Sequence, residues 1–183
     1  RKTWNQLSRS RRNQVNKAKR KGGDIEELTN EAELSTIYSS IDKNIQGKFS
    51  HLIPPYTYIQ NFFHLFIQEG KGRFFITKYE NKVIGGIIIG LDNNKENAYS
   101  LYYWGKTKTY KHLYPTIFTI WYAMTYVEKL GYKYFDFMDC GYIHENAGKP
   151  RFILQFGGKQ HATRRWYKFN WNWINWIASK FYD

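Results

Sequence analysis

The chain has 183 residues, of which 42% are hydrophobic and 20% aromatic, and this apolar content excludes an intrinsically disordered chain. The length suits one domain of roughly 100 to 200 residues, and the longest apolar run (83–91) is far shorter than the roughly 20 residues of a membrane-spanning helix. A single Cys excludes an intrachain disulfide, five scattered His residues show no metal-ligand spacing, and a net charge of +13 favours anionic partners.

Positive charge is concentrated at the amino-terminal end. Nine Lys or Arg and no acidic residue lie in positions 1–21, which leaves a net charge of +4 for the other 162 residues. Ser8 is placed to cap a helix that runs to about Lys21 and ends at Gly22 and Gly23. We therefore predict a basic helical arm over residues 1–22. It is either a surface for an anionic partner, such as nucleic acid, the polyphosphate of a nucleotide-type cofactor or anionic lipid headgroups, or a solvated helix face.

Two amphipathic helices are predicted next. Over residues 30–46 the apolar side chains Leu34, Ile37 and Ile41 recur at helical spacing, and Gly47 ends the pattern. Pro54 and Pro55 open the second helix, which ends before residues 70–72.

The period of the pattern then changes from helical to that of strands. Residues 73–79 and 82–91 are rich in Phe, Ile and Val and are joined by Glu80-Asn81, which predicts a β-hairpin. A third strand is predicted over 98–104, so three consecutive strands should pair antiparallel.

The last third of the chain returns to mixed elements. Pro115 opens a helix that runs to about Leu130 and ends at Gly131. We expect a short strand over 134–138, a short helix or loop, a strand over 159–169 and an aromatic last segment. The order predicts an α/β fold with a mixed, mostly antiparallel sheet flanked by helices. A doubly wound fold is disfavoured, since no GxGxxG or Walker-type loop is present.

Three short segments of the sequence are similar to one known family. They are Trp4-Asn5-Gln6-Leu7-Ser8, Gly131-Tyr132-Lys133-Tyr134-Phe135-Asp136-Phe137, and Arg151-Phe152 followed by Phe156-Gly157-Gly158. Together they resemble the FemABX branch of the GNAT acyltransferase superfamily. The resemblance covers nearly the whole chain and matches the second of the two GNAT-like halves usual in that branch. It implies that residues 23–183 form one GNAT-like acyltransferase domain, the second half of a longer protein.

The resemblance also implies a function. Members of this branch are bacterial enzymes, many of which add amino acids to peptidoglycan precursors from aminoacyl-tRNA, and relatives use acyl-CoA. We expect a cytoplasmic acyl or aminoacyl transferase that acts on an amine of a peptidoglycan or other sugar-linked cell-envelope precursor. The donor, aminoacyl-tRNA or acyl-CoA, would be a substrate and not a tightly bound cofactor. Action at the inner face of the membrane would bring peripheral contact with lipid, whereas DNA is not an expected partner.

One departure from the family pattern keeps an alternative open. The family commonly has Lys after the closing Arg-Phe, whereas this chain has Ile153 after Arg151-Phe152. The glycine-rich pyrophosphate loop usual in GNAT enzymes is also absent. The alternative is a noncatalytic GNAT-like module that binds tRNA or another anionic polymer.

The resemblance implies that the donor pyrophosphate lies at the start of the helix after the central strands. The corresponding loop here is rich in cations and hydroxyl groups, and a helix N-terminus adds partial positive charge. Arg151 from the closing motif could supply further charge. The alternative is an ordinary polar loop. The candidate donor-binding residues are Lys106, Thr107, Lys108, Lys111, Thr116 and Arg151.

Acyl transfer to an amine needs a group that removes the amine proton. Asp136 and Asp139 are the best candidates, since two acids at the end of a strand can share an environment that raises one pKa; a structural role for Asp136 is the alternative. His144, with Glu145, is a second candidate base, and Tyr142 could donate its phenol proton. Cys140 is interpreted as an incidental thiol.

The carboxy-terminal segment combines cations with Trp and Tyr. Such mixtures are typical of a membrane interface or of stacking on sugars and bases. Trp173, Trp176, Ile177 and Lys180 also fit one helical face packed on the core.

Overall fold

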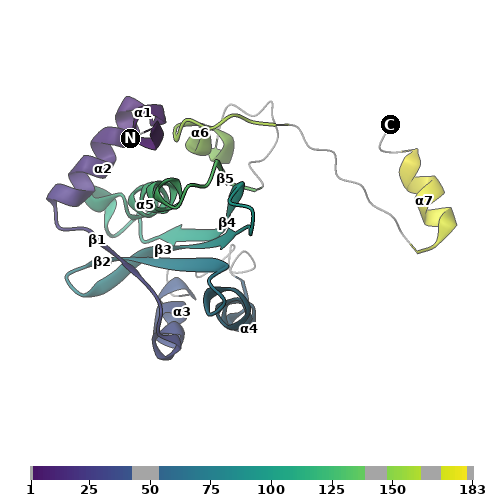
Figure 1. Ribbon diagram of the computed structural model, residues 1–183, viewed down its shortest axis with the longest axis horizontal. Helices are drawn as coiled ribbons and strands as arrows, with labels where there is room; N and C mark the ends of the chain where they lie inside the picture. Colours follow the sequence, from purple (N-terminus) through teal and green to yellow (C-terminus); the bar gives the residue numbers. More distant parts are fainter. Residues whose placement is uncertain (1, 43–53, 139–147, 162–169, 181–183) are drawn as a thin grey trace.

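The computed structural model describes residues 2–42, 54–138, 148–161 and 170–180 (Figure 1). Its strands are β1 (Asp24–Glu27), β2 (Gly72–Tyr79), β3 (Lys82–Leu91), β4 (Asn97–Gly105) and β5 (Tyr134–Asp136). Its α-helices are α1 (Lys2–Gln6), α2 (Arg9–Arg20), α3 (Leu34–Asp42), α4 (Tyr56–Phe62), α5 (Pro115–Lys129), α6 (Gly148–Leu154) and α7 (Asn172–Ser179).

The five strands form one sheet in the order β1-β2-β3-β4-β5. The first three pairings are antiparallel and the last, between β4 and β5, is parallel. A parallel pair needs a crossover connection, and here α5 supplies it. The predicted mixed, mostly antiparallel α/β fold and the predicted hairpin at Glu80-Asn81 are therefore confirmed.

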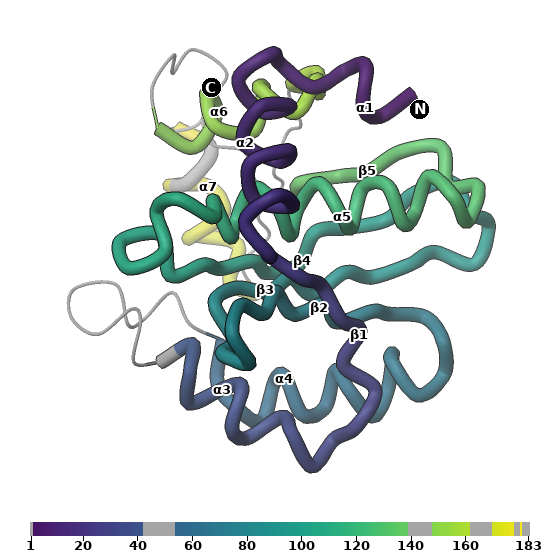
Figure 2. The backbone as a smooth tube through the Cα atoms, turned by 90° about the vertical axis from the view of Figure 1, so that its left-hand side faces the viewer, coloured from purple at the N-terminus to yellow at the C-terminus, as the bar shows by residue number. Residues whose placement is uncertain are grey.

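Helices cover both faces of the sheet. Figures 1 and 2 show α1, α2, α5 and α6 on one side and α3 and α4 on the other. Adjacent residues of β2 serve opposite layers, because successive side chains of a strand point to opposite faces: Phe75 packs in the core on the α5 side and Phe74 in the core on the α3 side. Strands buried on both faces explain the long apolar runs of the predicted hairpin.

The basic helix α2 packs against α5. Leu7, Val15 and Ala18 are buried in the same core as Ile120 and Ala123. The Ser8 Oγ accepts a hydrogen bond from the Arg11 backbone N–H at 3.3 Å, which confirms the predicted cap. The basic residues of this helix lie on its remaining faces, except Arg11, which is buried. The boundary at residue 22 between an arm and a domain stays a prediction.

Several local predictions need correction. The helix predicted over 30–46 begins as a 3-10 turn (Glu31–Glu33) before α3, and its expected continuation past residue 42 lies outside the described residues. The second amphipathic helix ends in a π-helical turn (Phe63–Ile67). Residues 159–161 of the strand predicted over 159–169 are not in a strand, and the rest lie outside the described residues. Strand β1 and helix α1 were not predicted.

Within the parts of the chain that the structure describes, no helix combines the length and the apolar character needed to cross a membrane.

Candidate functional site

The site is built where β4 ends and α5 begins. Gly105 is the last residue of β4, and the next backbone N–H, of Lys106, donates to the Ile84 carbonyl at 2.7 Å. A short 3-10 turn (Lys111–Leu113) follows, and Tyr114 then adopts a left-handed conformation (φ 47°, ψ 51°) just before Pro115. This turn redirects the chain so that the first turn of α5 lies against the end of the strand.

A glycine makes this close approach possible. A Cβ atom on Gly105 would lie 2.4 Å from the Thr116 Oγ1 and 2.8 Å from the Thr116 backbone nitrogen, which is closer than real Cβ contacts. Two buried hydroxyl groups fix the helix from below: those of Thr77 on β2 and Thr119 on α5 share a short hydrogen bond. The Thr119 hydroxyl also donates to the Pro115 carbonyl at 2.7 Å. The start of α5 is therefore held at a fixed height above the sheet.

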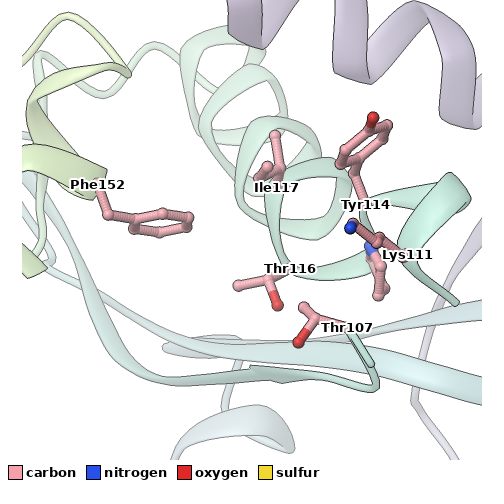
Figure 3. A pocket seen from close by; sticks show the side chains of 7 residues that line it. Thr107, Lys111, Tyr114, Thr116, Ile117 and Phe152 are labelled. Atoms are coloured by element: carbon pink, nitrogen blue, oxygen red, sulfur yellow. The ribbon is translucent and has the colours of Figure 1, made fainter. Parts of the chain in front are cut away.

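A cavity of about 150 Å³ opens at this point (Figure 3). Figure 3 shows Phe152 on one side of it, Tyr114 and Lys111 on the other, and Thr107 and Thr116 between them. Tyr114 makes no side-chain hydrogen bond to the first turn of α5. The lining is mostly apolar, and the N-terminus of α5 adds partial positive charge at this end of the cavity. Its lining residues are Thr107, Lys111, Tyr114, Pro115, Thr116, Ile117 and Phe152.

The Phe152 wall is held by α2 and β4. The Phe152 ring stacks on Tyr103 with centroids 6.4 Å apart, and the Arg11 guanidinium lies 4.5 Å above the same ring. The Arg11 Nη2 donates to the Phe152 carbonyl at 3.3 Å, and its Nη1 donates to the Gln14 Oε1 at 2.9 Å. Arg11 is only 5% exposed, and this burial lowers its pKa. A buried cation thus ties α2 to the wall of the cavity.

Positive charge surrounds the opposite wall. The Lys17 Nζ on α2 lies 5.6 Å from the centre of the Tyr114 ring, a cation–π contact beside the cavity. Lys108, Lys111 and His112 are exposed on the loop that precedes α5. The charge of α2 and that of the loop therefore lie on the same side of the molecule.

The structure brings together half of the predicted donor residues. Thr107, Lys111 and Thr116 line the cavity, whereas Lys106 and Lys108 are on its loop without lining it. Arg151 is exposed on α6 and does not line it either. The wall residue is its neighbour Phe152, which sequence reasoning missed although the Arg151-Phe152 pair was singled out.

The predicted base Asp136 lies elsewhere on the sheet. It ends β5 and is paired in register with Tyr99, six residues before Gly105 on β4. At a strand rise of about 3.3 Å per residue, Gly105 lies about 20 Å further along the sheet. The Asp136 Oδ1 accepts a hydrogen bond from the Met138 backbone N–H at 2.6 Å. Asp139, Tyr142 and His144, with Cys140 and Glu145, lie outside the described residues.

Tyr102, on the face of β4 that points toward α3, has a hydroxyl group with a raised pKa. Burial, and to a lesser extent the nearby Tyr38, raises the pKa of Tyr102 to about 12. Tyr102 packs against the core on the α3 side and stacks on Trp104 with centroids 6.1 Å apart. Its phenol therefore keeps its proton between pH 10 and 12, where an ordinary tyrosine has lost it.

Comparisons with known proteins identify the family and the fold. The sequence model of a family described as an acetyltransferase (GNAT) domain matches residues 9–146, which confirms the predicted superfamily. A comparison with curated protein sequences finds no match.

Among solved structures, the fold is similar to that of FemX, with a TM-score of 0.67 and 12% identity over 85% of this chain. This chain spans 55% of the FemX chain. It is also similar to a ribosomal-protein-alanine N-acetyltransferase from Brucella melitensis biovar Abortus 2308 (TM-score 0.55, 10% identity, 81% of this chain and 100% of that one). A third similar structure is AAC(6')-Iy in complex with a bisubstrate analogue that contains CoA (TM-score 0.53, 11% identity, 81% of this chain and 98% of that one). At these identities the likeness is one of fold, and the FemX likeness agrees in fold with the predicted FemABX branch.

Proposed function

Because the chain belongs to the acetyltransferase (GNAT) domain family, we propose that it transfers an acyl or aminoacyl group from a phosphate-bearing donor to an acceptor amine. The observation that carries the proposal is the cavity at the start of α5. Its position fits the place where the family resemblance puts the donor pyrophosphate, and Thr107, Lys111 and Thr116 supply a cation and two hydroxyl groups there.

The proposed reaction is the transfer of an acyl group from the donor to an amine. The acceptor nitrogen attacks the acyl carbon, the carbon–sulfur bond of a thioester or the carbon–oxygen bond of an aminoacyl ester breaks, and the amine loses one proton while the leaving group gains one. No covalent enzyme intermediate is required. The protein must hold the donor by its anionic part and accept the amine proton.

For the base we propose Asp136 first, because it ends the strand that lies parallel to β4. Its carboxylate already accepts a hydrogen bond from the Met138 N–H, so Asp139 and His144 stay as alternative bases, with Tyr142 as the proton donor to the leaving group. If the Asp136→Asn variant still binds the donor but no longer turns over, Asp136 is supported as the base. Turnover retained in Asp136→Asn removes that role and turns the test to Asp139→Asn and His144→Ala.

For the acceptor we propose an amine of a peptidoglycan or other sugar-linked cell-envelope precursor. The support is the similarity of the three sequence segments to the FemABX branch, together with the fold shared with FemX. The donor is either aminoacyl-tRNA or acyl-CoA, and both offer phosphate to the same cavity.

The decisive experiment is a thermal-shift and calorimetric titration with coenzyme A, acetyl-CoA and total tRNA at low and physiological salt. We expect Lys111→Gln to weaken donor binding by about fivefold to tenfold, since it removes one charge-assisted contact. Lys129→Gln is the matched control, because it removes the same charge at the other end of α5. Equal effects of the two substitutions, or no binding of any donor, would contradict the proposal.

A second candidate function is that of a noncatalytic module for an anionic polymer. The observation that favours it is a basic hollow of about 390 Å³ on α2, lined by Asn13, Asn16, Lys19 and Arg20. In that case RNA binds at α2, Lys19→Gln weakens it, and no acyl transfer accompanies binding.

A further inference from the structure

Helix α7 presents aromatic side chains to solvent. Trp171, Trp173 and Trp176 are 64%, 62% and 62% exposed, and Ile177 is 41% exposed. Figure 1 shows α7 at the far end of the molecule, apart from the sheet and the helices that cover it. The expectation that Trp173 and Trp176 pack on the core of this chain is therefore not met.

The aromatic residues share one face of the helix. Residues three and four positions apart lie on the same side of an α-helix, so Trp173, Trp176 and Ile177 form a single apolar stripe. Asn175 falls on the other side, and Asn172, four residues before Trp176, lies at the edge of the stripe. The apolar face of such a short amphipathic helix is stable against an apolar surface, and its polar face is stable in water.

The charge of the segment has one sign. Between residues 146 and 182 the sequence has seven Lys or Arg and no Asp or Glu. Directly after α7, the Lys180 Nζ lies 4.3 Å from the centre of the Trp176 ring. The methylene stem of a lysine in this position can lie along the ring while its ammonium group reaches outward.

We propose that α7 docks on the surface of an anionic lipid bilayer, with its axis in the plane of the interface. Indole rings prefer the depth of the lipid headgroups, where the ring is shielded from water and the N–H can still hydrogen-bond. Lys180 would meet anionic headgroups at that depth, and Asn175 would face away from the bilayer.

The dimensions of the helix fit lying on a membrane and exclude crossing one. Eight residues of helix are about 12 Å long, against about 30 Å for the hydrocarbon core of a bilayer. One short helix gives reversible attachment, so the bound protein can leave the surface.

The test uses the full chain and large unilamellar vesicles made either of phosphatidylcholine or of equimolar phosphatidylcholine and phosphatidylglycerol. We expect co-sedimentation with the anionic vesicles only, with a blue shift of Trp emission and quenching by brominated lipid. Trp173→Ala/Trp176→Ala should weaken partitioning by at least about tenfold, whereas Trp173→Phe/Trp176→Phe should retain most of it. Lys180→Gln should weaken it less and reduce its salt dependence.

Tyr58→Ala is the matched control, because Tyr58 is an exposed aromatic residue of another helix, α4, and is 49% exposed. Circular dichroism and the unfolding midpoint of each variant establish that the domain is intact. The proposal is overturned if the chain does not bind anionic vesicles, if it binds neutral vesicles equally well, or if the double alanine variant binds like the parent. It is also overturned if size-exclusion chromatography without lipid shows that the double alanine variant dissociates an oligomer, because the stripe is then an interface between copies. The inference does not depend on acyl transfer, so vesicle binding by a chain without transferase activity would leave it standing.

Discussion

Gly105 is the residue on which the geometry of the cavity depends most directly. Gly105→Ala places a methyl group against the Thr116 hydroxyl and backbone nitrogen, so the first turn of α5 must move away from the sheet. We expect a loss of stability of about 1–3 kcal/mol from overpacking and a loss of donor affinity that Lys111→Gln does not increase further. Urea unfolding and calorimetric titration measure the two effects. Gly158→Ala is the control, because nothing lies within 4 Å of its added Cβ; if both variants behave alike, the close approach is not important.

Tyr102 gives a pH signature of the folded state. Its pKa is raised from the usual 10 to about 12 by burial, and secondarily by Tyr38, so the folded chain holds this proton after the unfolded chain has released it. Stability from this group is therefore complete below pH 10 and is lost as the pH rises from 10 to 12. We expect the free energy of unfolding to fall less over this interval in Tyr102→Phe than in the parent. Absorbance titration of the phenolate bands checks the assignment, and identical pH slopes for the two proteins would refute it.

At the scale of elements, the pair of buried hydroxyl groups between β2 and α5 can be tested by a double-mutant cycle. Thr119→Val leaves the Thr77 hydroxyl without its partner in the core, which should cost about 1–3 kcal/mol. Thr77→Val/Thr119→Val removes both polar groups, and we expect it to cost less than the sum of the single substitutions. Chemical denaturation of the four proteins gives the coupling. Strict additivity would mean that the two hydroxyl groups do not interact.

The elements that the sequence revealed are those with strong periodicity. Helix α5 and the hairpin β2–β3 combine apolar patterns with clear turn residues, and both are observed as predicted. Strand β1 (Asp24–Glu27) was missed because three of its four residues are acidic and exposed; its place in the sheet comes from pairing with β2. A polar edge strand has no pattern of its own.

The candidate site was predictable in its loop but not in its far wall. Thr107, Lys111 and Thr116 belong to one segment whose charge and hydroxyl content are visible in the sequence. Phe152 joins them from α6, and only the folded chain shows that its ring and not the charge of Arg151 faces the cavity. The exposed stripe on α7 was likewise undecided, because the same spacing of Trp173 and Trp176 suits a core or an interface.

Across the whole molecule, Arg11 connects the basic helix to the cavity. Arg11→Ala removes the guanidinium from above Phe152 and leaves the Phe152 carbonyl without this donor. We expect a loss of about 2–4 kcal/mol in stability, because a large buried side chain leaves a cavity, and weaker donor binding through a displaced Phe152 wall. Arg11→Lys should not restore either property, since an ammonium group lacks the planar, multiply donating shape. Arg9→Ala, on the exposed side of α2, is the control. If Arg11→Ala binds the donor as well as the parent does, α2 does not contribute to the site.

The two hydrophobic layers share their central strands. Phe74 and Phe75 are neighbours in β2 and belong to opposite cores, and Ile87 and Ile88 repeat the arrangement in β3. If either layer unfolds, one face of β2 and β3 loses its packing and becomes exposed to water. The hairpin therefore makes unfolding cooperative: amide protons of β2 and β3 should exchange only through global opening, with one common free energy of opening that equals the stability of the entire domain.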